Sequence, residues 1–592
     1  MAAHLWSSDL HVSSYTMSVI ADLKQRKLVQ WSLAYIAAAF ALLQVIDIVG
    51  QQFDWPAALQ RSITLLMVVG FFVVVLLAWF HGERGAQRVS GTEATLLMLI
   101  LLMGAGVVWL FSSKASEPVN DGAGIRVAEA LPILSIAVLP LDNYSGDPSQ
   151  DYFAEGMTDQ LTAELAMISS LRVISRGSTT QFKGKQRAPT PDIARILNVD
   201  AIIEGSVLRI GDRVRITAQL IDARQDKHLW AKSFDGNSAD VLSLQDELAS
   251  AIAREIDVQL TPEEATALTS APSVIPKAYD AYLQGRYFFN RPSDDNLSKA
   301  IDQFEKAITL DPEFAPAYSG LSDAYLWAGY NESVFTASEA RIKAKDAAEK
   351  AVRLDANSTE ANTSQAVFRF FYEYDWAESE TQFRRVIARN PNYAFAHDQL
   401  ALMLAFTGRL DESIAASQRA LVLDPMAPQI SIDAIFAYAW RGEYELAREQ
   451  AARAAYLDPS FFFAPWANGW IDLQAGNAEA AIPHFMKAEA MESPLFTIAW
   501  LGYAWGVTGD KVRALDAIGE LNEKSLRGYV SPFNLAIVYL GLGEADQAIE
   551  YLEQAYAMDS QWLGWLGNDR IYDPLRSHPR FKRLIERLGL EG

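Results

Sequence analysis

Side chains that could perform covalent or metal chemistry are few in this sequence of 592 residues. It contains no cysteine, which excludes disulfides, thiolate metal sites and a cysteine nucleophile. Its seven histidines are scattered without the spacing of a ligand set, and no glycine-rich phosphate loop follows any predicted strand. The sequence therefore predicts no catalytic, metal-binding or cofactor-binding residue, and we expect the chain not to be an enzyme.

Charge is distributed unevenly along the chain. Residues 261–592 hold 30 Lys and Arg against 46 Asp and Glu, whereas residues 1–130 are nearly balanced, with 8 against 9. Nucleic-acid backbones require a basic face, so this acidity argues against a nucleic-acid partner. It is compatible with a soluble repeat array, or with a partner that carries positive charge.

Three apolar segments precede residue 113, namely residues 28–49, 63–80 and 94–111. They contain one charged residue, Asp47, and each is long enough to cross a hydrocarbon core of about 30 Å. We expect three transmembrane helices within residues 28–112, with residues 1–27 as the N-terminal tail and residues 113–131 as a linker.

Basic residues flank these segments asymmetrically. Five of them, Lys24, Arg26, Lys27, Arg84 and Arg88, lie on the side of the N-terminus. Only Arg61 and Lys114 lie near the span ends on the other side. Since basic loops stay in the cytosol, we expect a cytosolic N-terminus and export of everything after residue 112.

Residues 132–260 alternate between strand and helix patterns. Short apolar or alternating runs predict strands at 136–141, 171–175, 201–210, 214–222 and 227–234, and amphipathic periodicity predicts helices at 151–168, 191–197 and 242–258. Gly211-Asp212 between two of the strands is a hairpin turn signal. The pattern predicts a small α/β domain with a partly antiparallel sheet.

Several motifs in this domain carry a family resemblance. They are Ser135-Ile-Ala-Val-Leu-Pro-Leu141, Tyr152-Phe-Ala-Glu-Gly-Met157, Leu171-Arg-Val-Ile-Ser175, Glu204-Gly-Ser-Val207, Val214–Asp222 and His228-Leu-Trp-Ala231. The domain resembles the N-terminal domain of TolB and the FlgO-type domains of Gram-negative envelope proteins. The resemblance implies a protein-contact module in the periplasm, and hence an inner-membrane protein. The β-propeller of TolB has no counterpart here, so its peptidoglycan-linked role is not implied.

A period of 34 residues governs the C-terminal half. Leu423-Asp-Pro425 recurs as Leu457-Asp-Pro459, and a second ladder consists of Gly408, Gly442, Gly476, Gly509 and Gly543. Pairs of helices explain both, with Gly in the turn inside each pair and Pro after the second helix.

Small and aromatic residues recur within the second helices at spacings of four and three, as in Ala300, Phe304 and Ala307. This pattern resembles the tetratricopeptide repeat over about residues 277–557, in proteins that are sometimes labelled adenylate cyclase-associated. The resemblance implies a superhelix whose concave face is lined by the first helix of each pair. Residues 558–592 then form a C-terminal capping helix that shields the last repeat.

Projected onto this chain, the concave face carries an aromatic groove with acidic flanks. Its residues are Asp323, Trp327, Asp398, Phe406, Phe436, Trp440, Trp466, Trp470 and Tyr503. Such a groove suits a protein or peptide partner. The alternative, that these rings pack between the repeats, stays open for each of them.

The predicted fold class is thus multidomain: a three-span helical anchor in the lipid bilayer, a small α/β domain and an all-α tetratricopeptide superhelix. The predicted function is a periplasmic scaffold or sensor for protein–protein interactions in envelope assembly or signalling. An adenylate cyclase is excluded because the predicted cytosolic segments, about 27 and 13 residues long, are too short for its catalytic domain. A regulatory or accessory subunit of a membrane transport or cyclase-type signalling complex remains the alternative.

Overall fold

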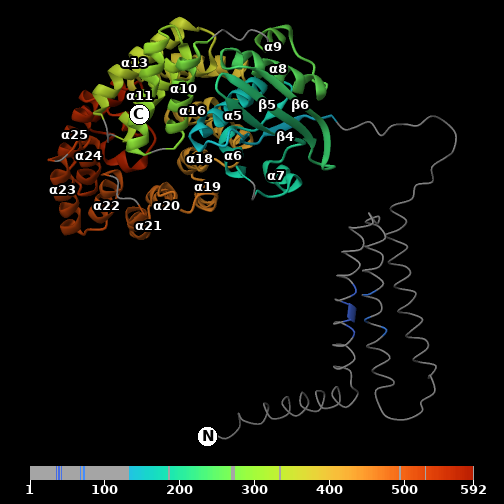
Figure 1. The fold of residues 1–592 in the computed structure, drawn as a ribbon. Coiled ribbons are helices and arrows are strands. Elements are labelled where there is room, and N and C mark those ends of the chain that lie inside the picture. Colours follow the sequence, from blue (N-terminus) through green and yellow to red (C-terminus); the bar gives the residue numbers. More distant parts are fainter. Residues whose placement is uncertain are drawn as a thin grey trace, which may run out of the picture. The chain divides into compact units, whose positions relative to one another are not determined.

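The computed structural model describes residues 132–590, except for 185–186, 269–273, 292, 332–334, 492–494 and 527. It also describes residues 35, 38, 39, 42, 67, 71 and 73. The chain divides into two compact units, Met1–Glu129 and Ala130–Gly592. The second unit contains a sheet with its covering helices and a long series of helix pairs (Figure 1).

The fold class predicted from the sequence requires one correction, which concerns the three-span anchor. Among the described residues, no helix combines the length and the apolar composition that crossing a bilayer requires. A span needs about 20 consecutive apolar residues, whereas the longest described helix has 18 residues and an alanine-rich buried face opposite charged side chains. The predicted spans, 28–49, 63–80 and 94–111, lie outside the described residues except for the seven positions given above. The architecture that the structure supports is a mostly helical repeat superhelix with a small sheet region.

Six strands form the sheet. They are β1 (Ser135–Val138), β2 (Asp142–Asn143), β3 (Arg172–Val173), β4 (Ala201–Ile210), β5 (Arg213–Asp222) and β6 (Lys227–Asn237). The order is β3-β1-β4-β5-β6, with β2 beside β4; β1 runs parallel to β3 and β4, and β4, β5 and β6 are antiparallel. The predicted mixture of parallel and antiparallel pairing is confirmed.

Helices cover both faces of this sheet. Ile136 and Val138 share one core with α5 (Asp151–Ala166) and α8 (Val241–Glu255). Ala137 and Leu139 point to the opposite face, where they pack against α7 (Thr190–Leu197). Because neighbouring residues of a strand alternate between faces, the three apolar residues of β1 serve both cores, and all four of its residues are buried.

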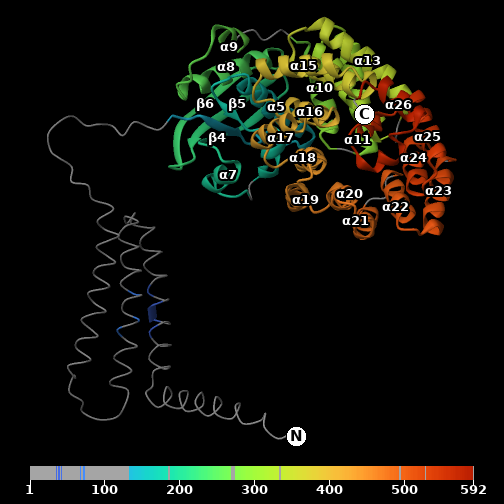
Figure 2. The same cartoon turned by 180° about the vertical axis from the view of Figure 1, so that it is seen from behind.

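Sixteen described helices form eight successive pairs after the sheet (Figures 1 and 2). They are α10 (Pro276–Phe289), α11 (Asp294–Leu310), α12 (Ala315–Asn331), α13 (Ala337–Leu354), α14 (Thr359–Phe368), α15 (Trp376–Arg389), α16 (Ala394–Phe406), α17 (Leu410–Leu423), α18 (Pro428–Trp440), α19 (Tyr444–Leu457), α20 (Phe463–Gln474), α21 (Ala478–Met491), α22 (Leu495–Val507), α23 (Lys511–Ser525), α24 (Pro532–Gly541) and α25 (Ala545–Ala557). The chain ends with two 3₁₀ turns, Gln561–Leu566 and Arg570–Leu575, and α26 (Pro579–Arg587).

The glycine ladder lies in the turns inside the pairs, as predicted. Gly408, Gly442, Gly476, Gly509 and Gly543 have φ values of 78°, 86°, 82°, 88° and 79°. These values belong to the left-handed region, which glycine enters without the steric cost that a Cβ atom would add. Each glycine therefore ends the first helix of its pair and lets the second begin within three residues.

Close helix packing explains the alternation of small and aromatic residues. The Phe485 ring of α21 lies against Gly469 of α20, where an added Cβ would meet the ring at 2.8 Å. Phe304 of α11 lies in the same way against Gly285 and Gly320 on the two neighbouring first helices. Phe304 and Phe485 are both fully buried.

The sheet domain packs onto turns between the helix pairs. The Ser178 hydroxyl donates to the Asp424 carboxylate at 2.5 Å, and the Ser175 backbone N–H donates to the Leu423 carbonyl at 2.8 Å. One repeat earlier, the Asn392 side-chain amide donates to the backbone carbonyls of Ala166 and Leu171 at 3.0 and 2.7 Å. Residues at equivalent ends of α15 and α17 therefore hold the sheet domain in place.

A pair of glycine substitutions tests the close packing between the helices of a pair, as seen at Phe485. Gly469→Ala brings a methyl group against the buried Phe485 ring, and we expect it to lower the free energy of unfolding by about 1–3 kcal/mol. Gly519→Ala, in α23, is the control: its Cβ meets nothing within 4 Å, so the helix should gain about 0.5–1 kcal/mol. Denaturant unfolding of the full-length protein, followed by circular dichroism, measures both. Equal effects of the two substitutions would contradict the packing explanation.

Candidate functional site

The nine predicted groove residues fall into two groups. Asp398, Phe406, Phe436, Trp466, Trp470 and Tyr503 are buried, with 9% or less of their surface exposed. Asp323, Trp327 and Trp440 are half-buried. All nine lie on first helices of pairs, as projected, but most of the aromatic set has no free surface in this structure.

The chain's own C-terminal segment covers the buried group. The Trp565 ring lies 5.0 Å from Phe436, 5.8 Å from Trp466 and 6.1 Å from Trp470, measured between ring centroids. Trp562 stacks on Phe496 at 4.8 Å. The sequence predicted a capping helix within residues 558–592. A helix, α26, lies in this range and packs against α25, and residues 561–575 before it cross the first helices of several repeats.

Polar side chains of this segment donate hydrogen bonds to the last backbone carbonyls of two first helices. The Asn568 amide donates to the carbonyl of Phe406, the last residue of α16, at 2.7 Å. Arg570 donates to the carbonyl of Gln474, the last residue of α20, at 2.6 Å. The last carbonyls of a helix have no partner within it. The segment supplies a donor to the Phe406 carbonyl, and at the Gln474 carbonyl Arg570 joins the Tyr444 hydroxyl of α19, which donates at 2.9 Å.

Asp569 is the buried polar centre of the segment. Its carboxylate accepts hydrogen bonds from Trp470 Nε1 at 2.9 Å and from the Gln474 amide at 2.6 Å. Burial raises the pKa of the Asp569 carboxyl to about 6, although these donors lower it. Trp470 is therefore held both by ring packing and by a hydrogen bond to the segment.

Residues just before and at the start of this segment also contact the second and third helix pairs. Gln561 donates its side-chain amide to the Tyr372 hydroxyl, and Tyr374 donates to the Ser560 carbonyl at 2.8 Å. Arg341 of α13 pairs with Asp559 at 2.9 Å. Within this unit the array thus closes on itself through residues 559–561, which explains why its concave side is so deeply buried.

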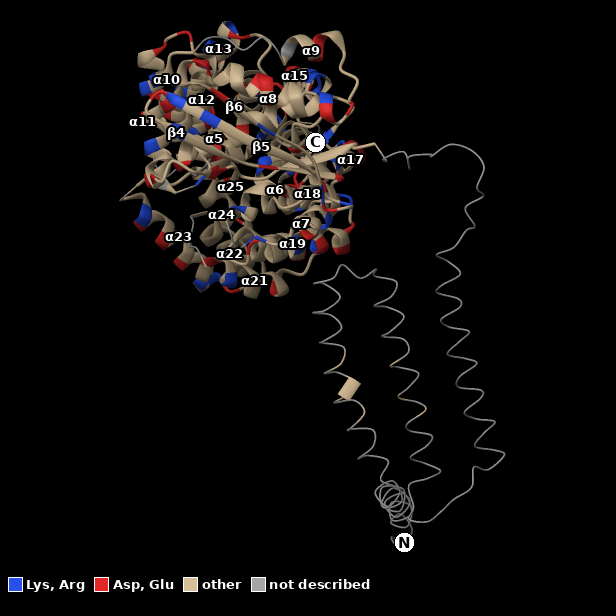
Figure 3. Cartoon of the chain, turned by 45° about the vertical axis from the view of Figure 1, so that its right-hand side comes forward, with Lys and Arg blue, Asp and Glu red and all other residues tan. Residues whose placement is uncertain are grey.

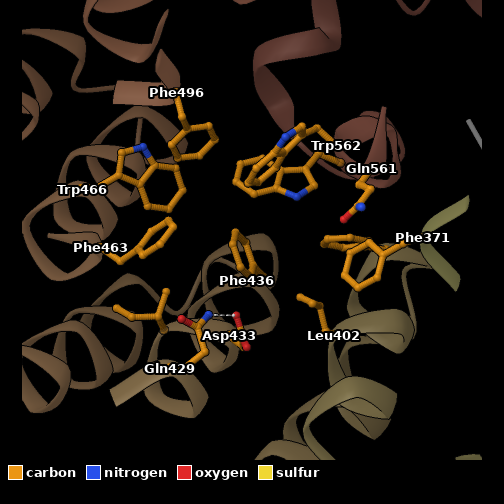
Figure 4. A pocket seen from close by; sticks show the side chains of 13 residues that line it. Phe371, Leu402, Gln429, Asp433, Phe436, Phe463, Trp466, Phe496, Gln561 and Trp562 are labelled. Carbon is orange, nitrogen blue, oxygen red and sulfur yellow. Dashed lines mark hydrogen bonds between the residues drawn. The ribbon is translucent and has the colours of Figure 1, made fainter. Parts of the chain in front are cut away.

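A small cavity remains between the segment and the first helices (Figure 4). Its volume is about 30 Å³. Eight aromatic side chains line it: Phe371, Phe406, Phe436, Phe463, Trp466, Phe496, Trp562 and Trp565. Leu402, Gln429, Ile432, Asp433 and Gln561 complete the wall. We take this cavity, with the half-buried residues around it, as the candidate site.

Asp433 brings a carboxyl group to this aromatic wall. It accepts a hydrogen bond from the Gln429 amide at 2.9 Å and shares a hydrogen bond with Asp398 on the preceding first helix. Burial raises the pKa of Asp398 to about 7; burial and the neighbouring carboxylate raise that of Asp433 well above its ordinary value. Two carboxyl groups therefore lie side by side in the interior.

Asp323 and Trp327 lie farther toward the start of the array. The Asp323 carboxylate accepts from the Ser364 hydroxyl at 2.5 Å and lies 4.0 Å from the Arg286 guanidinium. Burial raises the pKa of Asp323 to about 6, against the effect of these partners. Most other charged groups lie on the outside, along helices such as α21 and α23 (Figure 3).

Sequence reasoning missed the cavity residues that come from the C-terminal segment. Trp562-Leu-Gly-Trp565 directly follows the last predicted repeat, and two indoles three residues apart are a signal for an anchored segment. Asp433 follows Asp398 by 35 residues, one more than the period of 34, so both lie on first helices at positions that differ by one residue. Phe463 and Phe496 stand at the starts of α20 and α22, where the projection of the concave face placed no residue.

Comparison with known proteins supports the repeat assignment. The tetratricopeptide repeat family matches residues 533–561, which confirms a repeat of this kind at α24 and α25. A protein of Rhizobium meliloti (strain 1021) named "Putative adenylate cyclase 3" is 38% identical over 221 residues, or 36% of this chain. The chain spans only 37% of the length of that relative.

Solved structures show similarity to part of this chain. The type IV pilus biogenesis factor PilW is 18% identical, with a TM-score of 0.30 over 36% of this chain and 92% of that protein. YrrB, described as a tetratricopeptide protein with an unusual peptide-binding site, is 23% identical, with a TM-score of 0.23 over 32% of this chain and 90% of that protein. The resemblance of residues 132–260 to TolB and FlgO domains stays a prediction.

The buried carboxyl groups predict how stability depends on pH. Asp323, Asp398, Asp569 and Glu164 have folded-state pKa values of about 6, 7, 6 and 8, above the ordinary value of about 4. The folded state therefore binds more protons than the unfolded state between pH 5 and 8, and the free energy of unfolding falls as pH rises through this window. Carboxyl groups whose pKa is lowered in the folded state, such as that of Glu155, titrate below this pH window.

We expect the full-length protein to melt several degrees higher at pH 5.5 than at pH 8.0. Asp569→Asn keeps an acceptor for Trp470 or Gln474 but cannot ionise, so its melting temperature should depend less on pH. Calorimetry at both pH values measures the effect, and a melting temperature that rises with pH would refute it.

Proposed function

We propose that this chain is a scaffold for protein–protein interactions, with the tetratricopeptide array as its binding module. A partner segment would contact the aromatic cavity and the half-buried side chains beside it. The proposal concerns recognition only and requires no reaction at the site.

The observation that supports it is the way the array holds its own C-terminal segment. Residues 561–575 insert two indoles among the aromatic rings and donate to carbonyl groups at the ends of two first helices. Aromatic anchors in a groove and hydrogen bonds to its polar rim are how peptides are recognised in protein grooves. The same wall is therefore chemically suited to a second chain.

The resemblance of residues 132–260 to TolB and FlgO domains supports a site of action in the bacterial envelope, where such domains contact other proteins. The specific contacts between this domain and the array, through Asn392 and Asp424, support their acting together. On this proposal the sheet domain orients the array toward its partner.

A second candidate is a regulatory subunit of a cyclase-type signalling complex. The relative named as an adenylate cyclase favours it, at 38% identity over 221 residues. In this role the array would bind a signalling protein, so both candidates use the same surface.

Two neighbouring phenylalanines provide the test. Phe463 lines the cavity, whereas Phe462 is half-buried beside it and does not. We expect Phe463→Ala to lower the yield of a crosslinked partner at least about tenfold, as loss of an aromatic anchor does. Phe462→Ala should leave the yield within about twofold.

Crosslinking in cells that express full-length protein, followed by purification and mass spectrometry, identifies and measures the partner. Melting curves of both variants show whether the fold is retained. If both variants capture the same partner as well as the wild type does, the cavity is not the binding surface and the proposal fails.

A further inference from the structure

The cavity has a chemical preference that the scaffold role does not specify. Gln561 turns its side-chain oxygen toward the cavity, and Asp433 lies in the wall, where one of its carboxyl oxygens accepts from the Gln429 amide (Figure 4). The Gln561 amide nitrogen is already used, because it donates to the Tyr372 hydroxyl and to the Leu326 carbonyl. These two hydrogen bonds use the nitrogen alone and leave the side-chain oxygen turned toward the cavity (Figure 4). The cavity therefore offers acceptors to a ligand.

The aromatic wall favours a positive charge. Eight rings surround the cavity, and the face of an aromatic ring attracts a cation within about 6 Å of its centroid. No Lys or Arg is among the described residues that line it. Acceptor oxygens together with aromatic faces are the requirements of an ammonium group.

The neighbouring carboxyl groups of Asp398 and Asp433 give an independent reason to expect a cation in the cavity. The Asp398 and Asp433 carboxyls lie next to each other, and their described hydrogen bonds come from Gln399, Gln429 and the pair itself. None of the ion pairs in the described residues involves either carboxyl. A cation that entered beside Asp433 would stabilise its ionised form. The acidic excess of residues 261–592 would also attract such a partner.

The volume of the cavity favours a small cationic group. A cavity needs about 10–15 Å³ to hold one water-sized group, so about 30 Å³ accommodates an ammonium nitrogen and the methylene next to it. A planar guanidinium or a quaternary ammonium group is larger. A primary ammonium group at the end of a slender chain fits best.

We infer that this cavity binds the ammonium group of a lysine side chain from the partner protein, with Asp433 and Gln561 as acceptors and the surrounding rings as a cation-binding wall. This inference rests on the proposed function and names the group that the scaffold recognises.

The first test uses the purified full-length protein and a small probe, Nα-acetyl-lysine amide. Trp466, Trp562 and Trp565 line the cavity, so occupancy should change the tryptophan fluorescence in a saturable way. Nα,Nε-diacetyl-lysine amide has a longer side chain without the charge, and we expect it to bind at least about tenfold more weakly. Equal responses to the two probes would overturn the inference without any substitution in the protein.

Matched variants provide the second test. Asp433→Asn removes the carboxylate from the cavity and should weaken binding of the lysine probe at least about tenfold. Asp398→Asn changes the neighbouring residue, which does not line the cavity; it removes the carboxyl that opposes ionisation of Asp433 and should leave binding equal or tighter. Equal weakening by both variants would contradict a direct contact with Asp433.

Capture of the crosslinked partner separates this inference from the proposed function. If Asp433→Asn captures the partner as well as the wild type does, while Phe463→Ala fails, the scaffold role stands and the lysine site is refuted. If the probe binds in an Asp433-dependent way but no partner depends on Phe463, the cation site stands and the scaffold role at this surface is refuted.

Discussion

Burial of the Trp565 indole among the rings of α18, α20 and α22 is the contact on which the rest of the array depends. The first helices carry aromatic side chains on the concave side, and this surface would be costly to leave in water. A buried indole removes roughly 150–250 Å² from solvent, about 4–6 kcal/mol at 25 cal/mol per Å². The C-terminal segment therefore belongs to the hydrophobic core and not to the surface of the array.

That burial also sets the electrostatics of the interior. Asp398, Asp433 and Asp569 lie where water is largely excluded, so their pKa values rise. Asp569 receives donors from Trp470 and Gln474, which ties the segment to α20. Asp433 has only amide and carboxyl partners and faces the remaining cavity. The same covering that stabilises the array thus creates a place where a cation would be favoured.

The sheet domain depends on the repeats in a different way. Asn392 and Asp424 occupy equivalent turns of successive repeats and hydrogen-bond to backbone and hydroxyl groups of the sheet domain. These two turn residues lie outside the helices themselves and are buried by the contact, so the array can use its turns for docking without disturbing the packing between helices. The first helices recognise the C-terminal segment, and the turns recognise the sheet domain.

The sequence by itself determined the strands, the helix pairs and the glycine turns, because alternation, helical periodicity and a left-handed φ are properties of a few neighbouring residues. It also placed the nine groove residues on first helices. Only the tertiary structure decided that Trp466 and Trp470 are covered, that residues 561–575 cross the concave side, and that Asp433 faces a cavity. The three-span anchor predicted from hydropathy is not supported among the residues that the structure describes, where no helix combines the length and the apolar composition of a membrane span. Trp470 and Asp569 are 99 residues apart in the chain, and contacts at that separation leave no local pattern, because they depend on how far the superhelix turns.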